Sequence, residues 1–158
     1  MTSLWRISNH CDLSGLGGEK SDGRWHTAGR GKRIVYLSEH PAVALLETLA
    51  NLKANPAVFP DRYQLLQVTV EQRVLDAARL ITGKSGYVID RLAPLSVTQK
   101  EGDNWLKLGD SVLLAVPSFP SPYSANYLFN PRHPDASGLK IEACRWIEYD
   151  KRLFHVHE

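Results

Sequence analysis

The sequence has little of several features that mark specialised protein classes. Its 158 residues include only two cysteines, Cys11 and Cys144, and these form no CxxC pair. Such scarcity argues against a zinc ribbon or a disulfide scaffold, and it predicts two reduced thiols. No apolar run approaches the roughly 20 residues that a membrane span requires. A membrane anchor is therefore not expected.

Strong charge of one sign is also missing. The formal net charge is +2, from 19 Lys and Arg against 17 Asp and Glu. This excess is too small for wholesale binding to duplex DNA, which normally needs a basic face. The opening residues, MTSLWRIS, lack the cationic and apolar regions of an export signal. Together these absences predict a cytoplasmic protein.

The remaining composition is that of an ordinary globular chain. Hydrophobic residues make up 43% and charged residues 23%, and there is no repeat or low-complexity tract. A chain of this length buries about two-thirds of the surface that its unfolded form exposes, which is enough to enclose a cleft. We therefore expect residues 1–158 to form one domain.

Local patterns predict both strands and helices. Their order is irregular and contains no repeating βαβ unit, which indicates an α+β fold around a split or bent mixed sheet. The segment NYLFNPRHPDAS is expected to be a structured loop, since Pro131 and Pro134 forbid a long regular element. Strands are expected at 4–8, 33–38, 63–71, 111–118 and 139–150, with a short helix within 98–111.

The segment between His40 and Lys53 has helical periodicity and one charged side chain, Glu47. Pro41 suits a first turn, and Ser38 can cap the helix. A helix that is apolar nearly all round is normally buried, so we expect Glu47 at a cleft wall or in an internal ion pair. The alternative is an exposed glutamate on a core-facing helix. One stripe holds Ala42, Leu45, Leu46, Leu49 and Leu52.

Positive charge gathers in one stretch of the chain. Arg24, in DGRWH, follows a glycine and precedes a large aromatic residue, as expected where a loop enters a pocket. Arginine suits phosphate because its planar fork binds two oxygens together. Arg30, Lys32 and Arg33 add charge nearby and favour a local anion site. The alternative for each of them is an ordinary solvated surface charge.

Two further residues stand at positions typical of a site. Tyr36 lies near the end of the predicted strand 33–38, where it can face the same crevice as Glu47. Core packing with a satisfied hydroxyl is the alternative role for this tyrosine. Ser118 stands where a buried strand ends, and a simple turn serine is its alternative.

Other motifs give no convincing site. TGKSG, at 82–86, is similar to a phosphate-binding loop, but Ala78 stands where the first glycine is required. His155 and His157 have no identifiable further metal ligands, and His133 is expected to brace its own loop. No metal site is predicted.

The motifs LWRIS, GRWH, IVYLS, ALLE, VPS and NYLFNPRHPD, in this order, resemble the RES-domain family of bacterial toxin-antitoxin toxins. The resemblance spans residues 4–147, although residues 72–110 carry no matching motif. It matches the family's arginine, tyrosine, glutamate and serine to Arg24, Tyr36, Glu47 and Ser118. The family resembles ADP-ribosyltransferases, whose cleft binds NAD and whose glutamate faces the nicotinamide ribose.

The resemblance implies breakdown of NAD by hydrolysis or phosphorolysis, with NAD as substrate and no metal. Glu47 would stabilise the ribose cation, and Arg24 would hold the pyrophosphate. Tyr36 would pack against the nicotinamide or ribose, and Ser118 would hold Arg24 or the substrate. The loop TAGRGK is longer than expected for the family, which leaves the role of Arg30 open.

The resemblance also implies a partner, a cognate Xre-family antitoxin through which any DNA contact would be made. Three alternatives stay open: ADP-ribose transfer to a protein, a non-catalytic nucleotide-binding module, and an RNA-directed toxin. The sequence does not reveal the acceptor of ADP-ribose, or the oligomeric state, for which a homodimer is one option.

Overall fold

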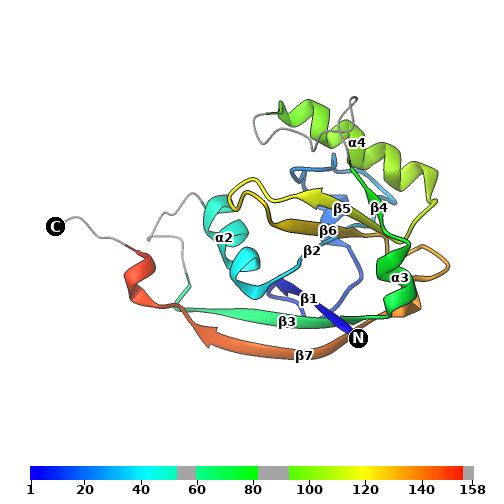
Figure 1. Ribbon diagram of the computed structural model, residues 1–158. Coiled ribbons are helices and arrows are strands. Elements are labelled where there is room, and N and C mark those ends of the chain that lie inside the picture. The colour runs from blue at the N-terminus through cyan, green and yellow to red at the C-terminus, as the bar shows by residue number, and fades with distance from the viewer. Residues whose placement is uncertain (53–59, 82–92, 155–158) are drawn as a thin grey trace.

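The computed structural model describes residues 1–52, 60–81 and 93–154. One seven-stranded sheet and several helices make up this part of the chain (Figure 1). None of its helices has the length and apolar character needed to cross a membrane. The elements are β1 (Thr2–Ile7), α1 (Gly17–Lys20), β2 (Val35–Ser38), α2 (Pro41–Asn51), β3 (Arg62–Val70), α3 (Gln72–Asp76), β4 (Arg79–Leu80), α4 (Leu95–Leu108), β5 (Leu113–Pro117), β6 (Ala125–Phe129) and β7 (Leu139–Glu148), with 3-10 turns at η2 (Ala136–Gly138) and η3 (Lys151–Leu153).

The sheet has the order β4-β5-β6-β2-β1-β3-β7 and is mixed, because β4 runs parallel to β5 while the other neighbours are antiparallel. Between β1 and β2 the ladder is reduced to one pair, Trp5 with Ser38. This seam divides the sheet into two parts, β4-β5-β6-β2 and β1-β3-β7. The expected α+β fold with a split mixed sheet is therefore confirmed.

Two apolar clusters pack the molecule. The larger one lies between the two parts of the sheet and contains Leu4, Leu37, Leu66, Leu113 and Phe129, among others. The second lies between the upper strands and α4, which covers them in Figure 1, and contains Trp25, Trp105, Leu114, Val116 and Leu128. Alternation along β5 supplies both clusters, since successive side chains of a strand point to opposite faces.

The structure corrects the loop expected at NYLFNPRHPDAS, residues 126–137. Residues 125–129 form β6, an internal strand between β2 and β5. Pro131 and Pro134 follow this strand, so they end it and do not prevent it. The helix expected within 98–111 is longer than predicted and begins at Leu95.

The helix α2 is confirmed, but its cap and buried face differ from prediction. His40 is the N-cap, and its Nδ1 accepts a hydrogen bond from the Ala42 N–H at 3.1 Å. The buried residues are Val43 and Ala44, whereas Leu46 of the predicted stripe is 41% exposed. Because nearly every position is apolar, periodicity alone did not identify the inner face.

The prediction of two reduced thiols is wrong. Cys11, in the loop after β1, and Cys144, in β7, form a disulfide with their Cα atoms 6.1 Å apart. The bracing role of His133 is confirmed, since its Nδ1 accepts from the Asp135 N–H at 3.1 Å. The motif at 82–86 and the histidines 155 and 157 lie outside the described residues.

Candidate active site

A cavity of about 940 Å³ opens beside the seam of the sheet. This volume lies near the upper end of the roughly 300 to 1,000 Å³ typical of ligand pockets. Its walls come from β1, β2, α2 and the GRWH loop, all of which meet where β1 and β2 diverge. Among the lining residues are three of the four predicted site residues, Arg24, Tyr36 and Glu47.

Glu47 projects from α2 into this cavity on the same side as the buried residues Val43 and Ala44. Its Oε1 accepts two hydrogen bonds, from Ser118 Oγ at 2.8 Å and from Asn126 Nδ2 at 2.6 Å. Within the described residues Glu47 has no ion pair. Of the two predicted settings, the structure therefore shows the cleft wall.

The amide of Asn126 is itself held from behind. Its Oδ1 accepts a hydrogen bond from Ser38 Oγ at 2.8 Å, so both ends of the amide have a partner. Ser38, Ser118 and Asn126 are all buried. Because an amide has a distinct donor and acceptor end, this pattern fixes the side chain in one orientation. Glu47 consequently faces the cavity with a rigid support at Oε1.

Arg24 reaches the cavity because its neighbour Trp25 is anchored behind it. Trp25 is buried in the second apolar cluster, and α4 crosses its backbone at Gly102. A Cβ atom at Gly102 would lie only 1.6 Å from the Trp25 carbonyl oxygen, so this crossing requires glycine. The exposed Arg24 guanidinium lies over the Phe119 ring, 4.7 Å from its centroid. An anion in the cavity can be reached from this position.

Tyr36 uses its hydroxyl to organise the same loop. The oxygen accepts from the Trp25 N–H at 3.1 Å and lies 2.7 Å from His26 Nδ1. The other ring nitrogen of His26 lies 3.0 Å from the Gly18 carbonyl, which only accepts, so that nitrogen carries the proton. In the neutral ring Nδ1 then accepts from Tyr36. Burial is the main cause that raises the pKa of this hydroxyl.

Arg6, on β1, is a cavity residue that the sequence analysis did not identify. Its Nη1 donates to the Tyr36 carbonyl at 3.2 Å, while its buried Nε has no partner. No carboxylate of the described residues forms an ion pair with it. Burial lowers the pKa of this guanidinium, against a smaller opposing effect of Asp12. A cation in this setting has unused donors for an anionic ligand.

Ser118 lies where the sequence placed it, just after β5, but it contacts Glu47 and not Arg24. The basic residues Arg30, Lys32 and Arg33 do not line this cavity. The described part of the chain contains no cluster of three or more His, Cys, Asp or Glu that could hold a metal ion.

Three supporting residues were missed by sequence reasoning: Arg6, Ser38 and Asn126. Each had a signal, since Arg6 is a cation within the strand-like LWRIS and the other two are polar residues in largely apolar strands. Buried polar residues normally have partners, but the partners here are up to 88 positions away. The sequence alone did not reveal which side chains meet.

Comparison with known proteins identifies relatives over almost the whole chain. A family model described as the RES domain matches residues 3–150. A Toxin Res of Pseudomonas putida (strain KT2440) is 40% identical over 151 residues, covering 96% of this chain and 99% of the relative. A Prs ADP-ribosylating toxin of Sphingobium sp. (strain YBL2) is 34% identical over 161 residues, covering 96% of both chains.

A solved structure has the same fold. The crystal structure of the M. tuberculosis MbcT-MbcA toxin-antitoxin complex contains a chain that matches with a TM-score of 0.72 and 15% sequence identity. The match covers 93% of this chain and 84% of that one. The family model and the two relatives each match nearly the whole chain, and both relatives are named as toxins. This chain therefore belongs to the RES-domain family.

Proposed function

We propose that this chain is the toxin of a bacterial toxin-antitoxin pair and that it cleaves the bond between nicotinamide and ribose in NAD. The observation that carries the proposal is the position of Glu47, held by Ser118 and Asn126 at the wall of a ligand-sized cavity. Two arginines, Arg6 and Arg24, line the same cavity. A carboxylate and two guanidiniums around one hollow match a substrate that carries a sugar and a diphosphate.

The chemistry requires a negative charge near the ribose. Nicotinamide is a cationic leaving group and departs neutral, so the reaction needs no general acid. Charge instead develops on the ribose as an oxocarbenium ion, which a preorganised carboxylate stabilises. The support on Oε1 positions the Glu47 carboxylate before the substrate arrives, and its Oε2 has no hydrogen bond to any described residue. Oε2 is then free to face the sugar.

Binding energy would come from the arginines. A bidentate guanidinium gives a diphosphate both charge and orientation, which aligns the reacting end. Arg24 would make this contact from the loop, and Arg6, with its unpaired Nε, would add a second one from β1. Tyr36 would contribute its ring to the wall beside the nicotinamide or ribose, while its hydroxyl keeps the loop in shape.

The acceptor of ADP-ribose is water or phosphate in this proposal. Transfer to a protein is the second candidate, favoured by the name of the Sphingobium relative, a Prs ADP-ribosylating toxin. The two differ in the product, because transfer leaves the ADP-ribose label on a macromolecule. A cognate antitoxin, of the Xre family, would hold the toxin inactive in the cytoplasm, and the solved toxin-antitoxin complex supports such a partner. A homodimer is a further option for the free toxin.

The test is chromatography of NAD incubated with purified, antitoxin-free protein, with and without phosphate. We expect free nicotinamide, and Glu47→Gln should lower its rate of release about 10²- to 10³-fold. Glu142→Gln is the matched control, since this exposed glutamate of β7 lies outside the cavity. For the arginine, Arg24→Ala should raise KM, while Arg62→Ala should not.

Arg62 is a suitable control because it also stacks on an aromatic ring, lying 4.9 Å from the Trp146 centroid, but does not line the cavity. Folded protein that leaves NAD intact would contradict the proposal. NAD binding without turnover would instead identify a nucleotide-binding module, and RNA decay with stable NAD on induction would identify an RNA-directed toxin.

A further inference from the structure

The basic stretch around position 30 faces a second cavity, of about 450 Å³, separate from the candidate active site. Three segments line it: the loop 30–33, the second half of α4 and the loop after β6. Five cationic side chains and one carboxylate are among the lining residues, in a chain whose net charge is only +2. The cations are Arg30, Lys32, Arg33, Lys107 and Arg132, and the carboxylate is Asp103.

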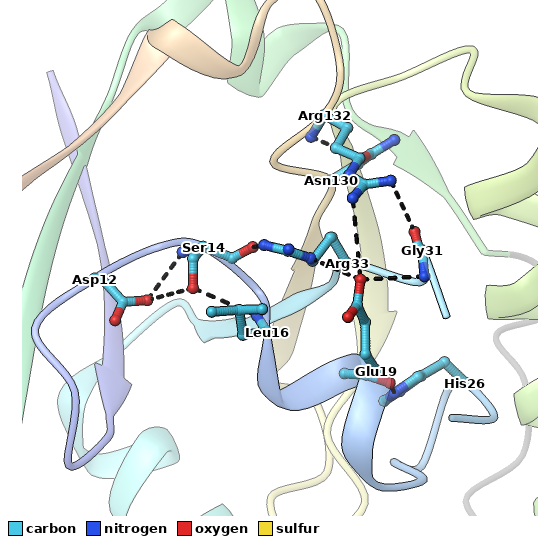
Figure 2. Close-up of polar contacts among 10 residues, drawn as sticks. Asp12, Ser14, Leu16, Glu19, His26, Gly31, Arg33, Asn130 and Arg132 are labelled. Carbon is cyan, nitrogen blue, oxygen red and sulfur yellow. Dashed lines mark hydrogen bonds and ion pairs between the residues drawn. The ribbon is translucent and has the colours of Figure 1, made fainter. Parts of the chain in front are cut away.

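Two of these cations are neutralised by neighbouring acids. Lys32 Nζ lies 3.4 Å from Asp103 Oδ2, and Arg33 Nε donates to Glu19 Oε1 at 2.8 Å. Figure 2 shows Arg33 reaching Glu19, which also accepts from the Gly31 N–H at 3.1 Å. These contacts hold the loop in place against α1. Lys32 and Arg33 therefore have an ordinary structural role, and their charges are balanced within the protein.

Three cations remain without a full partner. Arg30 and Lys107 are exposed and make no hydrogen bond or ion pair with any residue that the structure describes. Arg132 Nη1 donates to the Gly31 carbonyl at 3.4 Å, and its Nη2 is 4.0 Å from Glu19 Oε1, as Figure 2 shows. Like charges around one hollow repel each other, and an anion placed between them relieves this repulsion.

We propose that this cavity binds a phosphate-bearing small molecule, held by Arg30, Lys107 and Arg132. The volume fits a small ligand, since it lies within the roughly 300 to 1,000 Å³ of typical ligand sites. The chemistry favours phosphate, because two arginines and one lysine line the same space and each guanidinium can bind two oxygens. An acidic protein segment would be better matched by an extended stripe of charge than by one hollow of this size. The inference does not depend on the proposed cleavage of NAD.

The experiment is a titration of the purified protein with inorganic tripolyphosphate, followed by residue-resolved NMR. We expect saturable shifts of the amide signals of Gly31, Asn104 and Lys107. Lys107→Glu should weaken binding at these signals by about tenfold or more, because it puts a repulsive charge in place of an attractive one at close range. Arg30→Glu should act in the same direction, and neither exposed residue has a contact whose loss would unfold the protein.

Lys140→Glu is the control, since it makes the same change of charge at an exposed position of β7 outside the cavity. It should alter the affinity less than about twofold. An equal loss of tripolyphosphate affinity in Lys107→Glu and Lys140→Glu would overturn the proposal, because binding would then depend on net charge alone. Shifts confined to Gly18 and Gly23 would place the probe in the larger cavity and would also overturn it. So would tighter binding of a hexaglutamate peptide at the same signals.

Discussion

Asn126 donates a hydrogen bond to Glu47 across 2.6 Å, although the two residues are 79 positions apart in the chain. One residue is on an internal strand and the other on α2. The contact connects the helix to the sheet at the point where the carboxylate enters the cavity. The arrangement implies that the strand β6, and not the helix alone, determines where the charge of Glu47 lies.

Asn126→Ala should therefore slow cleavage of NAD with little change in KM. A hydrogen bond to a charged group contributes about 1.5 to 3 kcal/mol, equivalent to roughly a 10- to 150-fold lower rate if it acts fully in the transition state. The measurement is the release of nicotinamide at saturating NAD. Asn9→Ala, at an exposed position, should leave the rate unchanged. An unchanged rate in Asn126→Ala would show that Ser118 alone suffices to position Glu47.

Tyr36→Phe should destabilise the fold. It removes the acceptor of the Trp25 N–H and the hydrogen-bond partner of His26, both in a largely buried setting. Leaving such groups unsatisfied costs about 1 to 3 kcal/mol, measurable by urea unfolding. Tyr123→Phe is the matched control, since that side chain is fully exposed. Equal stability of the two variants would mean that water replaces the hydroxyl.

The same tyrosine gives a pH dependence. Burial raises its pKa in the folded state, so the unfolded chain is the first to lose this proton as the pH rises. The contribution of Tyr36 to stability is thus complete below pH 10.0, its ordinary pKa, and is lost progressively above it. The free energy of unfolding should fall more steeply in this alkaline range for the natural protein than for Tyr36→Phe. Parallel curves would contradict the assignment.

Gly102→Ala should disturb the support of the GRWH loop. The added methyl group would meet the Trp25 carbonyl oxygen at 1.6 Å, so α4 must move away. Overpacking typically costs about 1 to 3 kcal/mol, and a contact this close to a backbone atom belongs at the upper end, which exceeds the gain in helix propensity of about 1 kcal/mol. Thermal unfolding compares it with Gly17→Ala, whose new methyl group would have no atom within 4 Å. Only the first variant should lose stability.

The disulfide predicts a dependence of stability on reductant. Cys11 and Cys144 are 133 residues apart, and breaking such a link typically costs about 2 to 5 kcal/mol by freeing the unfolded chain. Dithiothreitol should lower the midpoint of urea unfolding of the natural protein. It should have no effect on Cys11→Ser, which has already lost the bond. A midpoint indifferent to reductant in both proteins would show that the link does not form in solution.

Sequence reasoning succeeded where the information was local. One carboxylate in an otherwise apolar helix singled out Glu47, with a cleft wall among its predicted settings, and the glycine before Arg24 indicated a loop that enters a pocket; both residues line the cavity. It failed to identify the buried face of α2, because both faces of this helix carry apolar residues. The apolar residues of α2 do not distinguish an inner face from an outer one, and packing of the helix against β1 and β2 decided that Val43 and Ala44 are the buried ones.

Long-range pairing was the other limit. Neither Cys11 with Cys144 nor Ser38 with Asn126 has a local signature, because a chain folded differently would bring other residues together. The prolines at 131 and 134 led to a loop being predicted over the whole segment, although the residues before them form β6. These errors concern residues whose roles depend on tertiary contacts, which override local propensity.

The single pair of residues that joins β1 to β2 also affects how a bound molecule would influence the protein. At this seam the backbone ladder has one rung, Trp5 with Ser38, and the residues on either side of it form the walls of the large cavity. A ligand bound both by Arg6 on β1 and by Glu47 on α2 would connect the two parts of the sheet across this seam. Ligand binding would then stabilise the pairing of β1 with β2, which has the fewest backbone pairs. Slower hydrogen exchange of the backbone amides near Trp5 and Ser38 would report this change.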